Sequence, residues 1–197
     1  ARVTRNGKIG LAAKSGNAVT MAFGADVADL DAHIAAGTLA EAGAKAAAGE
    51  AVDEATLNFL PPITKPSKII CLGLNYRDHA EESGLGIPEF PVLFARFPSS
   101  LTGHGAPVIL PKVSSQLDWE AELVVVLSKG GKNIGEADAL NHVAGYSVFN
   151  DASIRDYQLR TPQWTAGKNF DDTGAFGPYL VTPEELPAGA AGLKIEC

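Results

Sequence analysis

Three carboxylates at two-residue spacing, Asp118, Glu120 and Glu122, stand out in the segment LDWEAELVVVL. In a β-strand every second side chain points to the same face, so this spacing predicts one row of negative charge. Like charges this close repel each other, and burying one without a partner costs free energy. The segment is therefore either an exposed face of an edge strand or a cation site. The apolar run LVVVL, typical of a strand buried on both faces, favours the cation site.

Clustered carboxylate oxygens are ligands that suit Mg²⁺, Mn²⁺ or Ca²⁺, whereas zinc sites usually recruit His or Cys. A further ligand has to come from elsewhere in the chain. Asp151 is the candidate, because the aromatic-rich strand YSVF ends abruptly in Asn150 and Asp151. An Asx turn or a helix N-cap explains Asp151 equally well on local grounds.

Further polar residues could serve acid–base chemistry or bind a substrate. His79 and Glu82 are three residues apart, so on a helical turn they share a face and can form a hydrogen bond. Arg155 and Gln158 lie one turn beyond Asp151, from where they could reach a substrate carboxylate or carbonyl. The alternatives are a surface helix with incidental charges for the first pair, and pairing with nearby acids for the second.

Lys168 follows a glycine in the segment AGKNFDDTG, where a lysine could polarise a carbonyl or simply be a solvated loop residue. The segment does not fit a nucleotide-binding P-loop, because Asn169 stands where that motif needs Ser or Thr. Tyr76, together with Asn75, is expected to shape the site entrance and contact the substrate.

The elements that position these residues divide into two predicted domains. Residues 1–62 form a small N-terminal α+β domain, with strands at KIGLAA and AVTMAF and an alanine-rich helical stretch after them. The proline-rich PPITKP marks the boundary. Residues 63–197 contain short, irregularly spaced strands and few helices, so the fold class is α+β and largely β. The expected strands are KIICLGLNY, FPVLFARF, PVILP, LDWEAELVVVL, HVAGYSVFNDAS and GAFGPYLVTPEEL.

Composition limits the possible function classes. The chain has 197 residues, 46% of them hydrophobic and 20% charged, which is typical of a globular protein. A formal net charge of −7 with scattered basic residues argues against a nucleic acid or anionic membrane partner. No apolar run approaches the roughly 18 residues of a membrane span, and no export signal is visible. We therefore expect a cytoplasmic protein with Cys71 and Cys197 as thiols.

Four motifs, in order and at these separations, resemble the signature of the fumarylacetoacetate hydrolase family: LGLNYRDHAEE, LDWEAEL, FNDASIRDYQ and GKNFDDTGAFGP. The resemblance covers about residues 61–197, and the N-terminal part is similar to the small leading domain of many bacterial members. It implies a mixed β-sandwich or roll and a homodimer. Family members continue past this point, so we expect the C-terminal part of the fold to be absent from this chain.

The resemblance also implies roles for the residues. Mg²⁺ or Mn²⁺ would be held by Glu120, Glu122 and Asp151, with Asp118 beside these ligands. The catalytic groups would be a His79 general base on a mobile lid, Glu82 orienting it, and Lys168 stabilising an enolate oxygen.

The implied function is metal-dependent hydrolysis of a C–C bond in a 2,4-diketo acid such as an acylpyruvate or fumarylpyruvate. The same metal–enolate site could instead serve an oxaloacetate decarboxylase or a 2-hydroxymuconate-type isomerase or decarboxylase. A non-catalytic metal-binding remnant is the third hypothesis.

Overall fold

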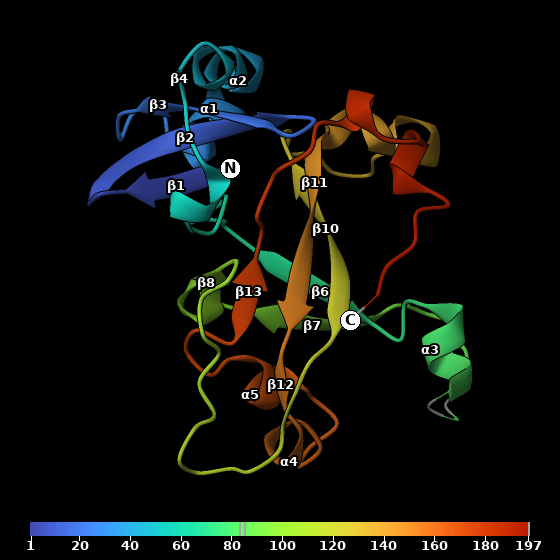
Figure 1. Cartoon of the computed structure of the whole chain (residues 1–197). Helices are drawn as coiled ribbons and strands as arrows, with labels where there is room; N and C mark the ends of the chain where they lie inside the picture. The colour runs from blue at the N-terminus through green and yellow to red at the C-terminus, as the bar shows by residue number, and fades with distance from the viewer. Residues whose placement is uncertain (83, 85, 197) are drawn as a thin grey trace.

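A computed structural model gives the structure of the protein and describes residues 1–82, 84 and 86–196. The N-terminal part is a five-stranded sheet in the order β4-β3-β2-β1-β5, with two helices packed on one face (Figure 1). Its elements are β1 (Arg2–Arg5), β2 (Lys8–Ser15), β3 (Ala18–Phe23), α1 (Leu30–Ala36), α2 (Leu39–Ala47), β4 (Glu50–Ala51), η1 (Glu54–Thr56) and β5 (Asn58–Phe59).

The two predicted N-terminal strands are confirmed as β2 and β3, and the alanine-rich stretch forms α1 and α2. Asp29 starts α1 by accepting a hydrogen bond from the amide of Ala32 at 3.0 Å. Gly37 ends it in the left-handed conformation with φ of 72°, which glycine adopts at little cost.

The rest of the chain is built around a four-stranded sheet in the order β10-β11-β13-β8 and two strand pairs, β6 with β7 and β9 with β12. The strands are β6 (Ile69–Gly73), β7 (Val92–Arg96), β8 (Leu101–Gly103), β9 (Leu117–Asp118), β10 (Ala121–Leu127), β11 (Val143–Asp151), β12 (Ser153–Ile154) and β13 (Gly174–Phe176). The helices are α3 (Arg77–Glu82), η2 (Pro98–Ser100), η3 (Glu136–His142), α4 (Arg155–Gln158), α5 (Thr165–Lys168), η4 (Pro183–Glu185) and η5 (Ala188–Ala190).

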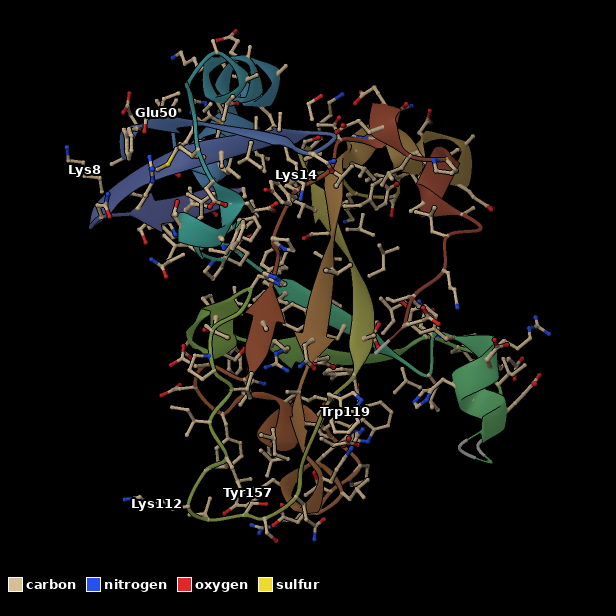
Figure 2. The ribbon with its side chains drawn as sticks, in the orientation of Figure 1. Lys8, Lys14, Glu50, Lys112, Trp119 and Tyr157 are labelled. Carbon is tan, nitrogen blue, oxygen red and sulfur yellow. The ribbon has the colours of Figure 1, made fainter. Side chains whose placement is uncertain are left out.

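One hydrophobic core joins the N-terminal sheet to the four-stranded sheet. Leu11 and Leu30 from the N-terminal part pack with Ile63 and Phe176, and Val124 of β10 packs against this cluster. At the opposite face of the N-terminal sheet, Lys14 and Glu54 form an ion pair of 2.6 Å, and Tyr179 donates to Glu54 at 2.9 Å. Figure 2 shows Lys14 at this junction.

The predicted single strand through the carboxylates is wrong, because it is two strands with different partners. β9 pairs with β12 and β10 pairs with β11, and Trp119 and Glu120 span the change. At the change, the Glu120 carbonyl accepts from the amide of Asp151 at 2.9 Å, and its amide donates to Asn150 Oδ1 at 3.1 Å. The strand is interrupted at Trp119 and Glu120 because its partner β11 ends at Asp151. Before this point the carboxylate segment pairs with β12, and after it with β11.

Burial of LVVVL on both faces is also a wrong prediction. β10 is an edge strand, and its outward residues Leu123, Val125 and Leu127 are exposed. The expected strand PVILP forms none, since residues 107–111 lie in a loop. Within the described residues, no helix has the length and apolarity needed to cross a membrane.

Candidate active site

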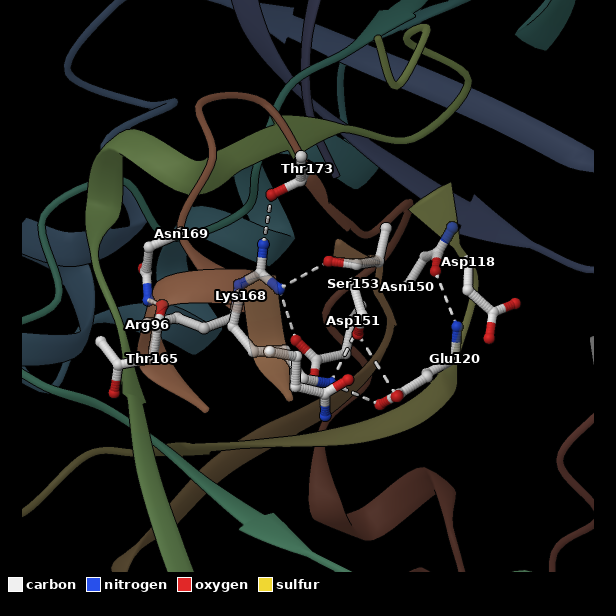
Figure 3. Close-up of polar contacts among 12 residues, drawn as sticks. Arg96, Asp118, Glu120, Asn150, Asp151, Ser153, Thr165, Lys168, Asn169 and Thr173 are labelled. Atoms are coloured by element: carbon white, nitrogen blue, oxygen red, sulfur yellow. Dashed lines mark hydrogen bonds and ion pairs between the residues drawn. The ribbon is translucent and has the colours of Figure 1, made fainter. Parts of the chain in front are cut away.

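The charged residues converge where β11 ends, where β9 gives way to β10, and where α5 meets β7 (Figure 3). Asp151 is buried as the last residue of β11, with its carboxylate facing cations from two elements. The alternative of a helix N-cap is wrong, since Ile154 occupies that position of α4. The strand end delivers the Asp151 carboxylate into the protein interior.

Lys168 bridges two of the predicted metal ligands. Its ammonium lies 2.7 Å from Glu120 Oε2 and 2.7 Å from Asp151 Oδ2, and the side chain is only 1% exposed. The nitrogen also stands 5.2 Å from the centre of the Phe94 ring, which excludes water on that side. Lys168 is thus a buried, doubly paired cation at the end of α5, so the solvated-loop alternative is wrong.

Arg96 is a member of this cluster that the sequence reasoning missed. Its guanidinium donates to Asp151 Oδ1 at 2.5 Å, to Thr173 Oγ1 at 2.8 Å and to Ser100 Oγ at 3.2 Å. The sequence does contain a pattern that indicates this role. Arg96 follows Phe94 by two residues in an apolar strand, so its charge lies on the same inward face. A cation there requires a buried anion nearby.

Arg155 joins the outer carboxylates to the cluster. It donates through Nε and Nη2 to one oxygen of Asp118, at 2.9 Å and 2.7 Å, and through Nη1 to Glu120 and Gln158. This pairing with nearby acids is the alternative that the sequence left open. The roles of Arg155 and Gln158 in binding a substrate remain predictions.

Glu122 lies beside Tyr76 at the other end of the row. The Tyr76 hydroxyl accepts from the amide of Leu123 at 3.1 Å, directly beside Glu122 in β10. Burial, together with the negative charges of Asp151 and Glu120, raises the pKa of the Glu122 carboxyl to about 7. Tyr76 therefore connects the segment before α3 to the acidic site, and its role at the entrance and in binding a substrate remains a prediction.

The predicted lid residues are on α3, which stands to the side of the sheet beyond edge strand β10 (Figure 1). The side chain of Glu82 lies outside the described residues. The interaction of His79 with Glu82, and the action of His79 on a water molecule, remain predictions.

The donor chemistry of the site fits a hard divalent cation. The negative charges of Asp151 and Glu120 help to raise the pKa of the Glu122 carboxyl. A divalent cation bound to carboxylate oxygens of these residues would relieve the repulsion between them. In the described part of the chain, no three His, Cys, Asp or Glu side chains already form a group that could hold a metal. Two of the carboxylates instead face Lys168, so metal ligation remains a prediction.

The family model described as fumarylacetoacetate (FAA) hydrolase C-terminal matches residues 68–197. The chain belongs to the fumarylacetoacetate hydrolase family. The resemblance carried by the four motifs is thereby confirmed.

Two mitochondrial oxaloacetate tautomerases are similar to this member of the family. The protein from Rattus norvegicus is 43% identical over 147 residues, which are 74% of this chain and 47% of the relative. The protein from Homo sapiens is 45% identical over 143 residues, 72% of this chain and 45% of the relative. The chain spans about half the length of the curated relatives it matches.

Solved structures of the family agree with the mixed α/β fold. Fumarylacetoacetate hydrolase from Exiguobacterium antarcticum superposes with a TM-score of 0.80 at 28% identity, covering 94% of this chain and 67% of that one. A 5-carboxymethyl-2-hydroxymuconate delta-isomerase from Mycobacterium smegmatis gives a TM-score of 0.66 at 27% identity, covering 92% and 64%. Both matches extend into the N-terminal sheet, since they cover more than nine-tenths of the chain.

Proposed function

We propose that this chain carries the catalytic site of an enzyme that interconverts the keto and enol forms of oxaloacetate or a closely similar 2-keto acid. The observation that carries the proposal is the buried Lys168 ammonium between Glu120 and Asp151. The proposal is supported by the similarity to two oxaloacetate tautomerases. It puts the isomerase alternative from the sequence ahead of C–C bond hydrolysis.

The charge of the site indicates how an anionic substrate could be held. Four carboxylates, Asp118, Glu120, Glu122 and Asp151, stand against three cationic side chains, so the protein groups alone do not favour an anion. A bound Mg²⁺ or Mn²⁺, held by Glu120, Glu122 and Asp151, would add the missing positive charge and polarise the substrate oxygens.

Enolisation requires a proton to leave C3 of the substrate and a proton to reach the keto oxygen. The C3–H electron pair becomes the C=C bond, and the former carbonyl π pair moves to oxygen. In our proposal Lys168 donates a hydrogen bond to that oxygen as its negative charge develops. His79 on α3 is the candidate for the group that takes the C3 proton, and the enolate oxygen takes its proton from solvent. Arg155 would bind a substrate carboxylate after leaving one of its acidic partners.

Hydrolysis of a 2,4-diketo acid is the second candidate. The likeness to the hydrolase from Exiguobacterium antarcticum, with its TM-score of 0.80, favours it. Hydrolysis needs a water molecule activated at the distal carbonyl, whereas tautomerisation needs none. Because His79 is the candidate base in both reactions, a His79→Ala variant should lose both, and the wild type's choice of substrate is what separates the two chemistries.

The test is ultraviolet absorbance of the enol form during equilibration of oxaloacetate, with Mg²⁺, Mn²⁺ or EDTA. We expect metal-dependent acceleration over the spontaneous rate, and little activity on acylpyruvates. Loss of the diketone chromophore of acylpyruvates without acceleration of oxaloacetate would favour the hydrolase. No turnover of either substrate, with Mn²⁺ bound, would favour the non-catalytic hypothesis.

The relatives' names include the word mitochondrial, so the cytoplasmic location remains a prediction.

A further inference from the structure

The Arg96 guanidinium is a buried cation with hydrogen-bond acceptors on several sides, among them the carbonyl of Ala152 at 3.3 Å. The residue is 1% exposed and donates to Asp151, Thr173 and Ser100. Thr173 and Ser100 are themselves fully buried, and the guanidinium stands 5.3 Å from the centre of the Phe149 ring. Burying a charge costs free energy unless the charge is paired, so the buried guanidinium needs the Asp151 carboxylate as its anion. Because its N–H groups point in fixed directions, the hydrogen bond also orients that carboxylate.

Asn169 fixes the backbone on both sides of Arg96. Its Oδ1 accepts from the amide of Phe97 at 2.7 Å, and its Nδ2 donates to the carbonyl of Ala95 at 2.9 Å. The side-chain amide thus occupies the edge of β7 as a neighbouring strand would (Figure 3). Since Asn169 directly follows Lys168, the same contact sets the separation between the two cations.

Arg96 and Lys168 therefore contact opposite oxygens of one carboxylate. Arg96 takes Asp151 Oδ1 at 2.5 Å, and Lys168 takes Oδ2 at 2.7 Å. With both oxygens engaged, rotation of the carboxylate about its Cβ–Cγ bond would break a charge-assisted hydrogen bond. A carboxylate fixed before a ligand arrives binds it without the cost of being ordered.

We propose that Arg96 is a positioning residue that holds the Asp151 carboxylate in the orientation in which it binds the divalent cation. This inference rests on the metal-dependent site of the proposed function and adds a residue to it. Arg96 touches neither the substrate nor the reacting atoms.

The direction in which Arg96→Met changes the affinity for a cation separates a positioning role from simple charge repulsion. Arg96 is a positive charge close to a cation site, so by Coulomb repulsion alone the neutral Arg96→Met should bind a cation more tightly. If Arg96 positions Asp151, the same variant should bind more weakly. Arg96→Lys also loses the contacts to Thr173 and Ser100 but can still place a charge on Asp151.

The experiment is calorimetric titration of Mn²⁺ into the wild type, Arg96→Met and Arg96→Lys, with circular dichroism to confirm folding. We expect the Mn²⁺ dissociation constant to rise about tenfold or more in Arg96→Met, the usual effect of losing a group that orients a metal ligand. Arg96→Lys should restore most of the affinity. Arg5→Met, which removes an exposed ion pair with Glu50, is the control and should leave the affinity unchanged.

Tighter or unchanged binding in Arg96→Met, or no recovery in Arg96→Lys, would overturn the proposal, as would a wild type that binds no Mn²⁺. If Arg96→Met does not fold, the neutral Arg96→Gln takes its place in the same comparison. The measurement uses no substrate. Failure of the proposed function, seen as Mn²⁺ binding without acceleration of oxaloacetate enolisation, is therefore distinguishable.

Discussion

The acidic groups of the site are organised around a lysine. Lys168 replaces water as the partner of Glu120 and Asp151, and its burial strengthens both interactions because the surroundings have a low effective dielectric. Removing Lys168 would leave Asp151 paired with Arg96 alone and Glu120 paired with Arg155 alone, so each carboxylate would lose part of its compensation. At the scale of the residue, stability and proposed catalysis therefore depend on the same atoms.

Replacing Lys168 by Met is expected to lower kcat for oxaloacetate enolisation about 100-fold, because one donor to the developing oxygen charge is lost. Stability should also fall, by roughly 3 kcal/mol, since the buried Asp151 carboxylate and the half-buried Glu120 carboxylate each lose a cation. Steady-state kinetics and urea denaturation measure the two effects. Lys14→Met, at an exposed ion pair, is the matched control; a Lys168→Met enzyme as active as this control would exclude the proposed role.

Cys71 in β6 is a thiol whose reactivity reports on the charges of the site. Burial, assisted by the charge of Asp151, raises the pKa of the Cys71 thiol to about 12. Below that pH the thiol stays protonated, and the thiolate is the reactive form. At pH 8 we expect alkylation of Cys71 by iodoacetamide to be much slower than in the urea-unfolded chain, as followed by peptide mass spectrometry. Equal rates in the folded and unfolded chains would contradict the raised pKa of this thiol.

At the scale of the element, the position of α5 depends on a close approach between Trp164 and β6. A side chain at Gly73 would collide with the Trp164 ring, which also packs edge-on against Phe94 with ring centres 5.7 Å apart. Trp164 stands at the N-cap of α5, and Lys168 ends the same helix. The glycine in β6 therefore helps to set where the lysine lies.

A Gly73→Val substitution should displace Trp164 and with it α5. We expect a loss of stability of about 1–3 kcal/mol from overpacking, together with reduced oxaloacetate turnover at temperatures where the variant is folded. Gly43→Ala in α2 is the control, because no atom lies within 4 Å of the added Cβ. That helical position should gain up to about 1 kcal/mol. A Gly73→Val protein with unchanged stability and kinetics would rule out the proposed link between β6 and Lys168.

At the scale of the whole molecule, one aspartate ties the N-terminal part to the proline-rich segment that follows it. Asp31 in α1 accepts hydrogen bonds from the amide of Thr64 at 2.9 Å, from its hydroxyl at 3.0 Å, and from the amide of Lys65 at 3.0 Å. The next turn of the chain leads into β6 and the site. Asp31 therefore couples the small N-terminal sheet to the position of the site elements.

Removing this carboxylate, in Asp31→Ala, should cost about 2 kcal/mol, since hydrogen bonds to a charged group are lost. The amides of Thr64 and Lys65 should exchange hydrogen faster, which can be measured by NMR. Asp29→Ala, the control, loses the α1 cap and about 1 kcal/mol but should leave the protection of these two amides unchanged. Equal protection in Asp31→Ala and wild type would show that the segment is held by other contacts.

The sequence alone determined the family and several of the strands. Strands such as β2, β3 and β11 could be predicted because their apolar alternation and flanking turn residues are local properties. The motif residues Glu120, Asp151 and Lys168 could be named because each lies in a short segment with its own pattern. Their participation in one cluster followed from family resemblance and not from spacing.

Only the tertiary structure decided which charges are neighbours. Arg96 and Asp151 are 55 residues apart, and Lys168 and Glu120 are 48 apart, so no local pattern relates them. The carboxylate segment pairs with β12 through β9 and with β11 through β10. Where it changes partner depends on where β11 ends, and the residues of the carboxylate segment do not contain that information. A buried ion pair forms only after distant strands have packed, because the low dielectric that strengthens it is supplied by the assembled core.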